Sequence, residues 1–106
     1  MGIRARLAAM RIPELYASGQ PVFSFEFFPP KTDAGYRSLF RTITDLTALE
    51  PGFVSVTCGA AGSTRKKTAD LVNRIQREIG LTAMAHVTCT GRSAEELADS
   101  LEEMER

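Results

Sequence analysis

One carboxylate stands in the middle of an aromatic stretch near the N-terminus. The stretch reads "VFSFEFFPPKT" over residues 22–32, and Glu26 is its only acid. Phenylalanines on both sides of Glu26 predict little water nearby, and removing water from a carboxyl group disfavours its charged form. A carboxylic acid still protonated near neutral pH can donate a proton to a substrate. Glu26 is therefore a candidate general acid; the alternative is a structural acid satisfied by Lys31, an arginine or backbone donors.

Two later stretches carry polar side chains that could join Glu26. Thr57 and His86 belong to apolar runs further along the chain, although a lone histidine also fits a hydrogen-bonded structural role. The turn "TCGAAGSTRKK" over residues 57–67 is rich in glycine and alanine, which lets a flat ligand or a phosphate approach the backbone. Its three cations (Arg65, Lys66 and Lys67) could attract phosphate. We favour the other interpretation, in which they form the solvated first turn of a helix.

Several classes of function lack the residues they need. No second His, Cys or acid stands at metal-ligand spacing from His86, and no GxGxxG or GxxxxGK[ST] motif occurs. Thirteen basic and 13 acidic residues cancel, which gives no basic footprint for nucleic acid. No apolar run approaches the roughly 18 residues of a membrane span, and the N-terminus lacks an apolar signal core. Cys58 and Cys89 form no CxxC pair, so we expect reduced thiols in a cytoplasmic protein.

The elements that must position these residues repeat three times as a β-run, a polar turn and a helical pattern. The predicted strands lie within residues 21–28, 52–58 and 81–89. The predicted helices cover residues 33–49, about 63–79 and 93–104, after a leading helix near the N-terminus. Thr32 or Asp33 caps the first of the three, Gly80 ends the second, and Ser93 with Glu96 forms a capping box for the third.

Alternation along the predicted strands separates a polar face from an apolar face. Glu26, Thr57 and Thr88 recur every 31 residues, and we expect Glu26, Thr57 and His86 at similar heights on neighbouring strands. Parallel strands with a polar inner face near their carboxyl ends are typical of a β/α barrel. The sequence thus predicts an α/β fold: an N-terminal helix plus three βα units of a TIM-type (βα)8 barrel. With 106 residues against about 250 for a closed barrel, we expect one domain over 1–106 and an incomplete barrel.

The stretches "FSFEFFPPKT", "PGFVSVTCGA" and "GLTAMAHVTC" resemble the N-terminal part of the methylenetetrahydrofolate reductase family. The resemblance covers about residues 22–89. It implies a (βα)8 barrel that holds FAD, in a cytoplasmic and often oligomeric enzyme of one-carbon metabolism. NADH or NADPH would reduce the flavin, which would then pass hydride to 5,10-methylenetetrahydrofolate to yield 5-methyltetrahydrofolate.

The same resemblance implies roles for individual residues. Glu26 matches the catalytic glutamate of the "EFFPP" motif, which protonates the folate ring nitrogen. Thr57 matches a threonine near the nicotinamide and flavin, while Cys58 and Ala60 match positions that line FAD and His86 matches a histidine of the flavin pocket. Cys58 departs from the pattern, because relatives commonly carry an aromatic residue there. If that ring packs on the flavin, cofactor affinity is lower in this chain.

Two other hypotheses remain open. The flavin and folate contacts that the family makes further along its sequence have no counterpart in residues 1–106, so this chain is not expected to suffice for the reaction alone. It could instead be a non-catalytic fragment or interaction module, associating with itself or with other barrel segments. A third possibility is another barrel enzyme, such as a lyase or aldolase, that uses Glu26 as a base.

Overall fold

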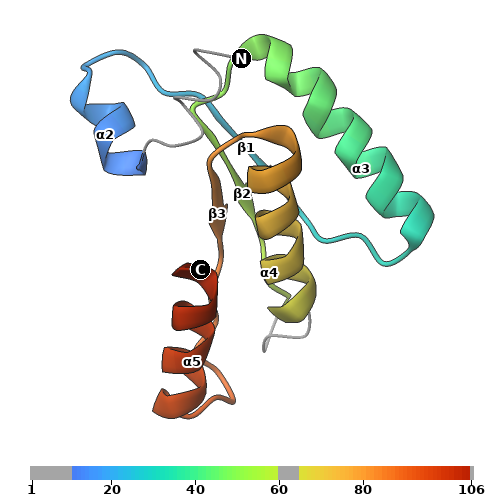
Figure 1. The fold of residues 1–106 in the computed structure, drawn as a ribbon, viewed down its shortest axis with the longest axis vertical. Helices are drawn as coiled ribbons and strands as arrows, with labels where there is room; N and C mark the ends of the chain where they lie inside the picture. Colours follow the sequence, from blue (N-terminus) through green and yellow to red (C-terminus); the bar gives the residue numbers. More distant parts are fainter. Residues whose placement is uncertain (1–10, 60–64, 106) are drawn as a thin grey trace.

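The computed structural model describes residues 11–59 and 65–105. These residues form a three-stranded parallel sheet in the order β1-β2-β3, with helices before and after the strands (Figure 1). The elements are α2 (Ile12–Ala17), β1 (Ser24–Phe27), α3 (Asp33–Leu46), η1 (Thr47–Leu49), β2 (Phe53–Val56), α4 (Arg65–Arg74), η3 (Ile75–Ile79), β3 (Ala83–Ala85) and α5 (Ala94–Glu105). This arrangement is α/β and is compatible with part of a TIM-type unit. None of the helices in the two described ranges is long and apolar enough to cross a membrane.

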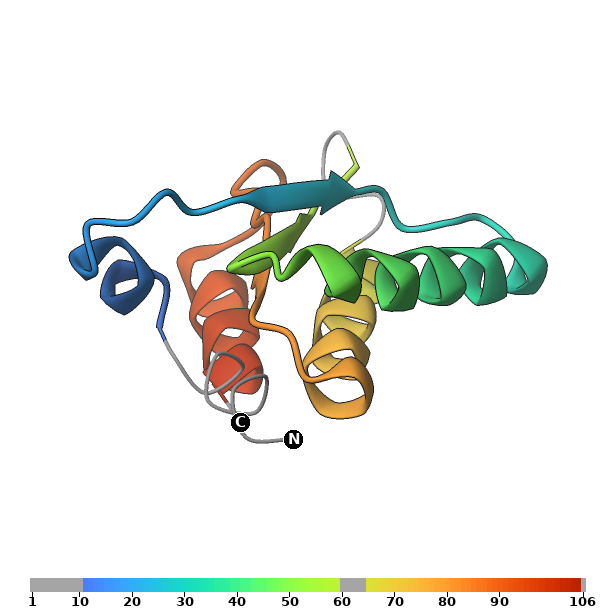
Figure 2. The ribbon, with the colours of Figure 1, turned by 90° about the horizontal axis from the view of Figure 1, so that it is seen from above.

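The core lies on one face of the sheet. Val54 and Val56 of the central strand β2 point to this face and are fully buried against Leu71 and Ile75 of the α4–η3 helix and Ile43 of α3. Figure 2, seen from above, shows α3 and α4 on the same side of the strands. The segregation of apolar side chains that the sequence predicted is therefore confirmed.

The polar side chains of the strands share the opposite face. Glu26 of β1 pairs in register with Ser55 of β2, which pairs with Met84 of β3. Thr57 and His86 each follow the last paired residue of their strand, and their backbone N–H groups continue the ladder to Phe27 and Val56. The register thus aligns residues about 29 positions apart. By the same offset Thr57 lies level with His86, as expected. Both lie two residues further along the sheet than Glu26, so the expected common height is wrong for Glu26.

Helix boundaries follow the capping signals of the sequence. The Thr32 side chain accepts a hydrogen bond from the backbone N–H of Gly35 at the start of α3, and Ser93 does the same for Glu96 at the start of α5. The α-helix after β1 ends at Leu46, three residues earlier than expected, because the chain continues in the 3-10 turn η1, which Glu50 ends in a left-handed conformation. These local bonds fix where the helices begin and how the chain returns to the sheet.

The second long helix ends differently from the regular helix that the sequence predicted. After Arg74 the last turn widens to a π-helix, η3, and Gly80 closes it with its N–H bonded to the carbonyl of Ile75. Gly80 has φ of +85°, a left-handed conformation that favours glycine. The widened turn brings the chain directly back into the strand β3. This strand has three residues and is shorter than the nine-residue run that suggested it.

Candidate functional site

Three polar side chains, from β1, β2 and the residue that follows β3, meet on the face of the sheet opposite α3 and α4. The Ser55 hydroxyl of β2 donates a hydrogen bond to Oε1 of Glu26 at 3.0 Å. Nε2 of His86, just beyond β3, lies 3.2 Å from the same Oε1. Glu26 therefore reaches over the central strand toward the third strand. The sequence expectation that Glu26 and His86 lie near each other agrees with this contact.

The surroundings of Glu26 are wetter than the sequence suggested. The Glu26 side chain is 55% exposed and that of His86 is 40% exposed. Phe25 and Phe27, the immediate neighbours of Glu26, point to the other face, where they pack against the core. Alternation along a strand separates the phenylalanine rings from the carboxylate, so sequence neighbours do not desolvate it. The expectation of an acid shielded from water by these aromatic neighbours is wrong for this chain.

Ser55 is the member of the cluster that sequence reasoning did not single out. It stands on the central strand, in register with Glu26, and only 5% of it is exposed. Its position on the polar face followed from alternation along the strand, but its role depended on the register between β1 and β2. A hydroxyl that lies one strand away from a carboxylate on the same face is the signal that could have identified it.

The other predicted cofactor residues separate from this cluster. The backbone N–H of Thr57 bonds to Phe27, and its carbonyl accepts a hydrogen bond from Thr68 of α4 at 2.8 Å. The thiol of Cys58 lies 3.9 Å from the Thr88 hydroxyl. Ala60 lies outside the described residues. The structure thus brings Glu26 and His86 together directly, whereas Thr57 and Cys58 line the ends of the strands.

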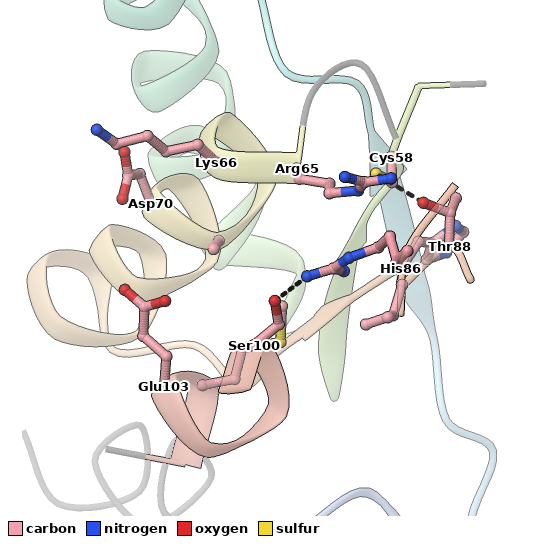
Figure 3. Close-up of a pocket in the computed structure, with 12 residues that line it drawn as sticks. Cys58, Arg65, Lys66, Asp70, His86, Thr88, Ser100 and Glu103 are labelled. Atoms are coloured by element: carbon pink, nitrogen blue, oxygen red, sulfur yellow. Dashed lines mark hydrogen bonds between the residues drawn. The ribbon is translucent and has the colours of Figure 1, made fainter. Parts of the chain in front are cut away.

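A cavity of about 270 Å³ opens beside the ends of β2 and β3, between α4 and α5 (Figure 3). Cys58, Thr88 and His86 border it at the strand ends, and His86 thus belongs both to the cavity and to the Glu26 cluster. Cations and acids both line it: Arg65, Lys66 and Arg92 on one hand, Asp70 and Glu103 on the other. The cavity therefore has mixed charge and directly adjoins the polar face.

One residue of the basic turn after β2, Arg65, has a structural role. A guanidinium nitrogen of Arg65 donates to the carbonyl of Thr90 at 2.9 Å, which ties the start of α4 to the loop after β3. Figure 3 shows Arg65 directed toward the strand ends, where Cys58 and Thr88 lie. Lys66 and Lys67 are exposed. This agrees with the interpretation of a solvated first helical turn.

A second arginine fixes the last helix. Arg92 donates to the Ser100 hydroxyl and to the carbonyl of Glu96, both in α5. Among the residues that the structure describes, no group of three or more His, Cys, Asp or Glu side chains could hold a metal ion. The groups that the cluster and the neighbouring strand end offer for chemistry are a carboxyl, a hydroxyl, an imidazole and a thiol.

The structure defines a class of protein. It is an α/β protein whose parallel strands carry a carboxyl–hydroxyl–imidazole cluster on one face, near their carboxyl ends, where barrel enzymes place their active sites. The family model described as methylenetetrahydrofolate reductase matches residues 11–106. The chain therefore belongs to the methylenetetrahydrofolate reductase family.

Curated relatives from plants and bacteria are similar to most of the chain. A rice (Oryza sativa subsp. japonica) protein named "Probable methylenetetrahydrofolate reductase (NADH)" is 42% identical over 91 residues, which cover 86% of this chain and 15% of the relative. "Methylenetetrahydrofolate reductase (NADH) 1" of Arabidopsis thaliana is 40% identical over 92 residues, or 87% of this chain and 16% of that protein. "5,10-methylenetetrahydrofolate reductase" of Escherichia coli (strain K12) is 42% identical over 79 residues, 74% of this chain and 27% of that protein. The chain thus spans about a sixth of the plant relatives and about a quarter of the bacterial one.

Proposed function

We propose that this chain supplies the N-terminal βα units of a TIM-type barrel that reduces 5,10-methylenetetrahydrofolate to 5-methyltetrahydrofolate, with FAD as cofactor and NADH or NADPH as reductant. Residues 1–106 form a single domain, the N-terminal portion of that barrel, in the cytoplasm, and further barrel segments complete the site. The observation that carries this proposal is the Glu26 carboxylate, held by Ser55 and His86 on the open face of the sheet. Family membership and the names of the relatives support the reaction.

Within this function, Glu26 is the acid. Its carboxyl group donates a proton to the ring nitrogen of the bound folate, which opens the five-membered ring to an iminium carbon. The chemistry that FAD supplies when bound is hydride transfer from the nicotinamide to that carbon. Proton and hydride together account for the added hydrogens of the product. His86 and Ser55 keep the Glu26 side chain directed over β2 while the proton leaves.

The residues at the strand ends are suited to one wall of a flavin site. Cys58, Thr88 and His86 border a cavity of about 270 Å³, slightly smaller than the roughly 300–1,000 Å³ of complete small-molecule sites. Thr57, Cys58 and His86 would therefore contact part of a dinucleotide, and Ala60, which lies outside the described residues, is the fourth contact proposed from this chain. Other barrel segments would enclose the remainder.

Two measurements test the proposal. The purified chain is mixed with FAD and examined for the absorption of a bound flavin. A folded chain that binds no FAD would show that residues 1–106 alone do not retain the cofactor. In the completed, flavin-loaded protein, Glu26→Gln keeps the shape of the side chain but supplies no proton. We expect flavin reduction by NADH to persist and folate reduction to fall about 10²–10⁴-fold, the usual contribution of a general acid. Equal loss of both half-reactions would refute the role of Glu26 as the acid.

A second candidate function is that of an interaction module. β1 and β3 are each paired on one side only among the described residues, and Phe23 and Phe28, which flank β1, are exposed. Unpaired strand edges with apolar neighbours favour association with another chain. Light scattering decides this point: self-association at micromolar concentration supports the module, and a cooperatively melting monomer opposes it.

A further inference from the structure

We propose that Ser55 is a positioning residue for Glu26, and that its small size and its hydroxyl together direct the carboxylate across β2 to His86. The part that Ser55 would play in catalysis rests on the proposed function, whereas the positioning itself does not. The contact between the Glu26 and His86 side chains crosses the whole width of the sheet, because Glu26 belongs to the first strand and His86 follows the third. Ser55 is the residue of the central strand between them, in register with Glu26.

Strand spacing explains why the central residue must be small. Neighbouring strands lie about 4.8 Å apart, so the backbones of β1 and β3 are separated by about 9.6 Å. The Glu26 and His86 side chains cover this gap by leaning toward each other above β2, where Nε2 and Oε1 approach to 3.2 Å. A long side chain at position 55 would occupy the same space. Serine leaves the space open and adds a donor beneath it.

The hydroxyl of Ser55 also determines which carboxyl oxygen is available. Ser55 Oγ donates to Oε1, and His86 Nε2 approaches the same atom, while no hydrogen bond of the described residues reaches Oε2. An oxygen with two lone pairs can accept two hydrogen bonds, both in a carboxylate and in the carbonyl oxygen of a neutral acid. The same two contacts therefore persist before and after proton transfer. Oε2 is left as the atom that carries and delivers the proton.

Burial makes the hydroxyl effective in this role. Ser55 is 5% exposed, so water competes poorly for its hydrogen bond even though Glu26 itself is half exposed. A hydrogen bond to a charged group is stronger than a neutral one. Removing the donor should shift the equilibrium between the Glu26 rotamers that contact His86 and those that do not. The population ratio of the two should fall about tenfold, which corresponds to the weakest hydrogen bonds to a charged group.

The test uses a matched pair of variants in the 106-residue chain. Ser55→Thr keeps the hydroxyl, and Ser55→Val has the same shape without it. His86 is the sole histidine of the sequence, so its ring protons are identified directly by NMR. We expect the nuclear Overhauser contact between these protons and the Glu26 γ-methylene group to persist with Thr and to weaken strongly with Val. Ser24→Val, on the same face of β1 and exposed, is the control and should leave the contact unchanged.

Equal intensity in the Thr and Val variants, whether strong or weak, overturns the proposal. Should the extra methyl groups prevent folding, Ser55→Ala replaces the pair: an undiminished contact in the Ala variant overturns the proposal, and a weakened one supports it. In the completed, flavin-loaded protein, Ser55→Val should slow folate reduction about tenfold and leave flavin reduction by NADH unchanged. If the unaltered protein reduces no folate, the proposed function fails while the NMR result still decides the role of Ser55.

Discussion

The hydrogen bond between Thr68 and Thr57 connects the stability of the fold to the strand end where the predicted cofactor residues lie. Thr68 is 1% exposed, and its hydroxyl donates to the Thr57 carbonyl at 2.8 Å, so that α4 is fastened to the end of β2. Replacing Thr68 by Val keeps the shape of the side chain but removes the donor. The carbonyl then loses a partner in a place that water reaches poorly.

The cost of this change can be worked out from the structure. Leaving a buried polar group without its partner costs about 1–3 kcal/mol; this bond is part-buried, and the added methyl group of valine recovers a fraction of the cost. We expect Thr68→Val to lower the free energy of unfolding by about 1.5 kcal/mol. For a chain of this size, that corresponds to a fall in Tm of about 6–12 °C. Urea unfolding followed by circular dichroism gives the first quantity, and thermal unfolding gives the second.

Thr44 provides a matched control. Its hydroxyl also donates to a backbone carbonyl at 2.8 Å, that of Phe40, but Thr44 is exposed. Water can replace the lost donor there, so Thr44→Val should change the free energy of unfolding by less than about 0.5 kcal/mol. Equal effects of the two substitutions, or no effect at Thr68, would refute the argument that burial of the hydrogen bond determines the cost.

Two further predictions concern the helices around this contact. Gly80→Ala places a β-carbon on a residue with φ of +85°, and no atom lies within 4 Å of that carbon, so the cost is backbone strain alone. We expect the free energy of unfolding in urea to fall by about 1 kcal/mol. An unchanged midpoint would contradict this expectation. Burial raises the pKa of Tyr36, and Asp70 raises it further while Arg74 lowers it. The unfolded state then loses the phenolic proton first, so stability falls as the pH rises above about 10. Tyr36→Phe should reduce that fall, and a fall of the same size in the variant would show that other groups cause it.

Much of the fold could be predicted from local patterns. The caps at Thr32, Ser93 and Gly80 involve residues at most five positions apart, so the sequence contains the whole interaction. Alternation along the strands correctly assigned the apolar face of β2 to the core and placed Ser55 on the opposite face. These features depend on backbone geometry that neighbouring residues specify by themselves.

The composition of the polar cluster was decided only by the tertiary structure. The sequence determined that Glu26 and His86 lie in or next to strands of a parallel α/β unit in the methylenetetrahydrofolate reductase family. It did not determine the register, and a register of about 29 residues rather than 31 places Ser55 level with Glu26. Nor did it determine exposure, because water around a strand residue depends on what covers its face and not on the residues beside it in the chain. Pairing between strands is a long-range property, and so is the environment of the carboxylate.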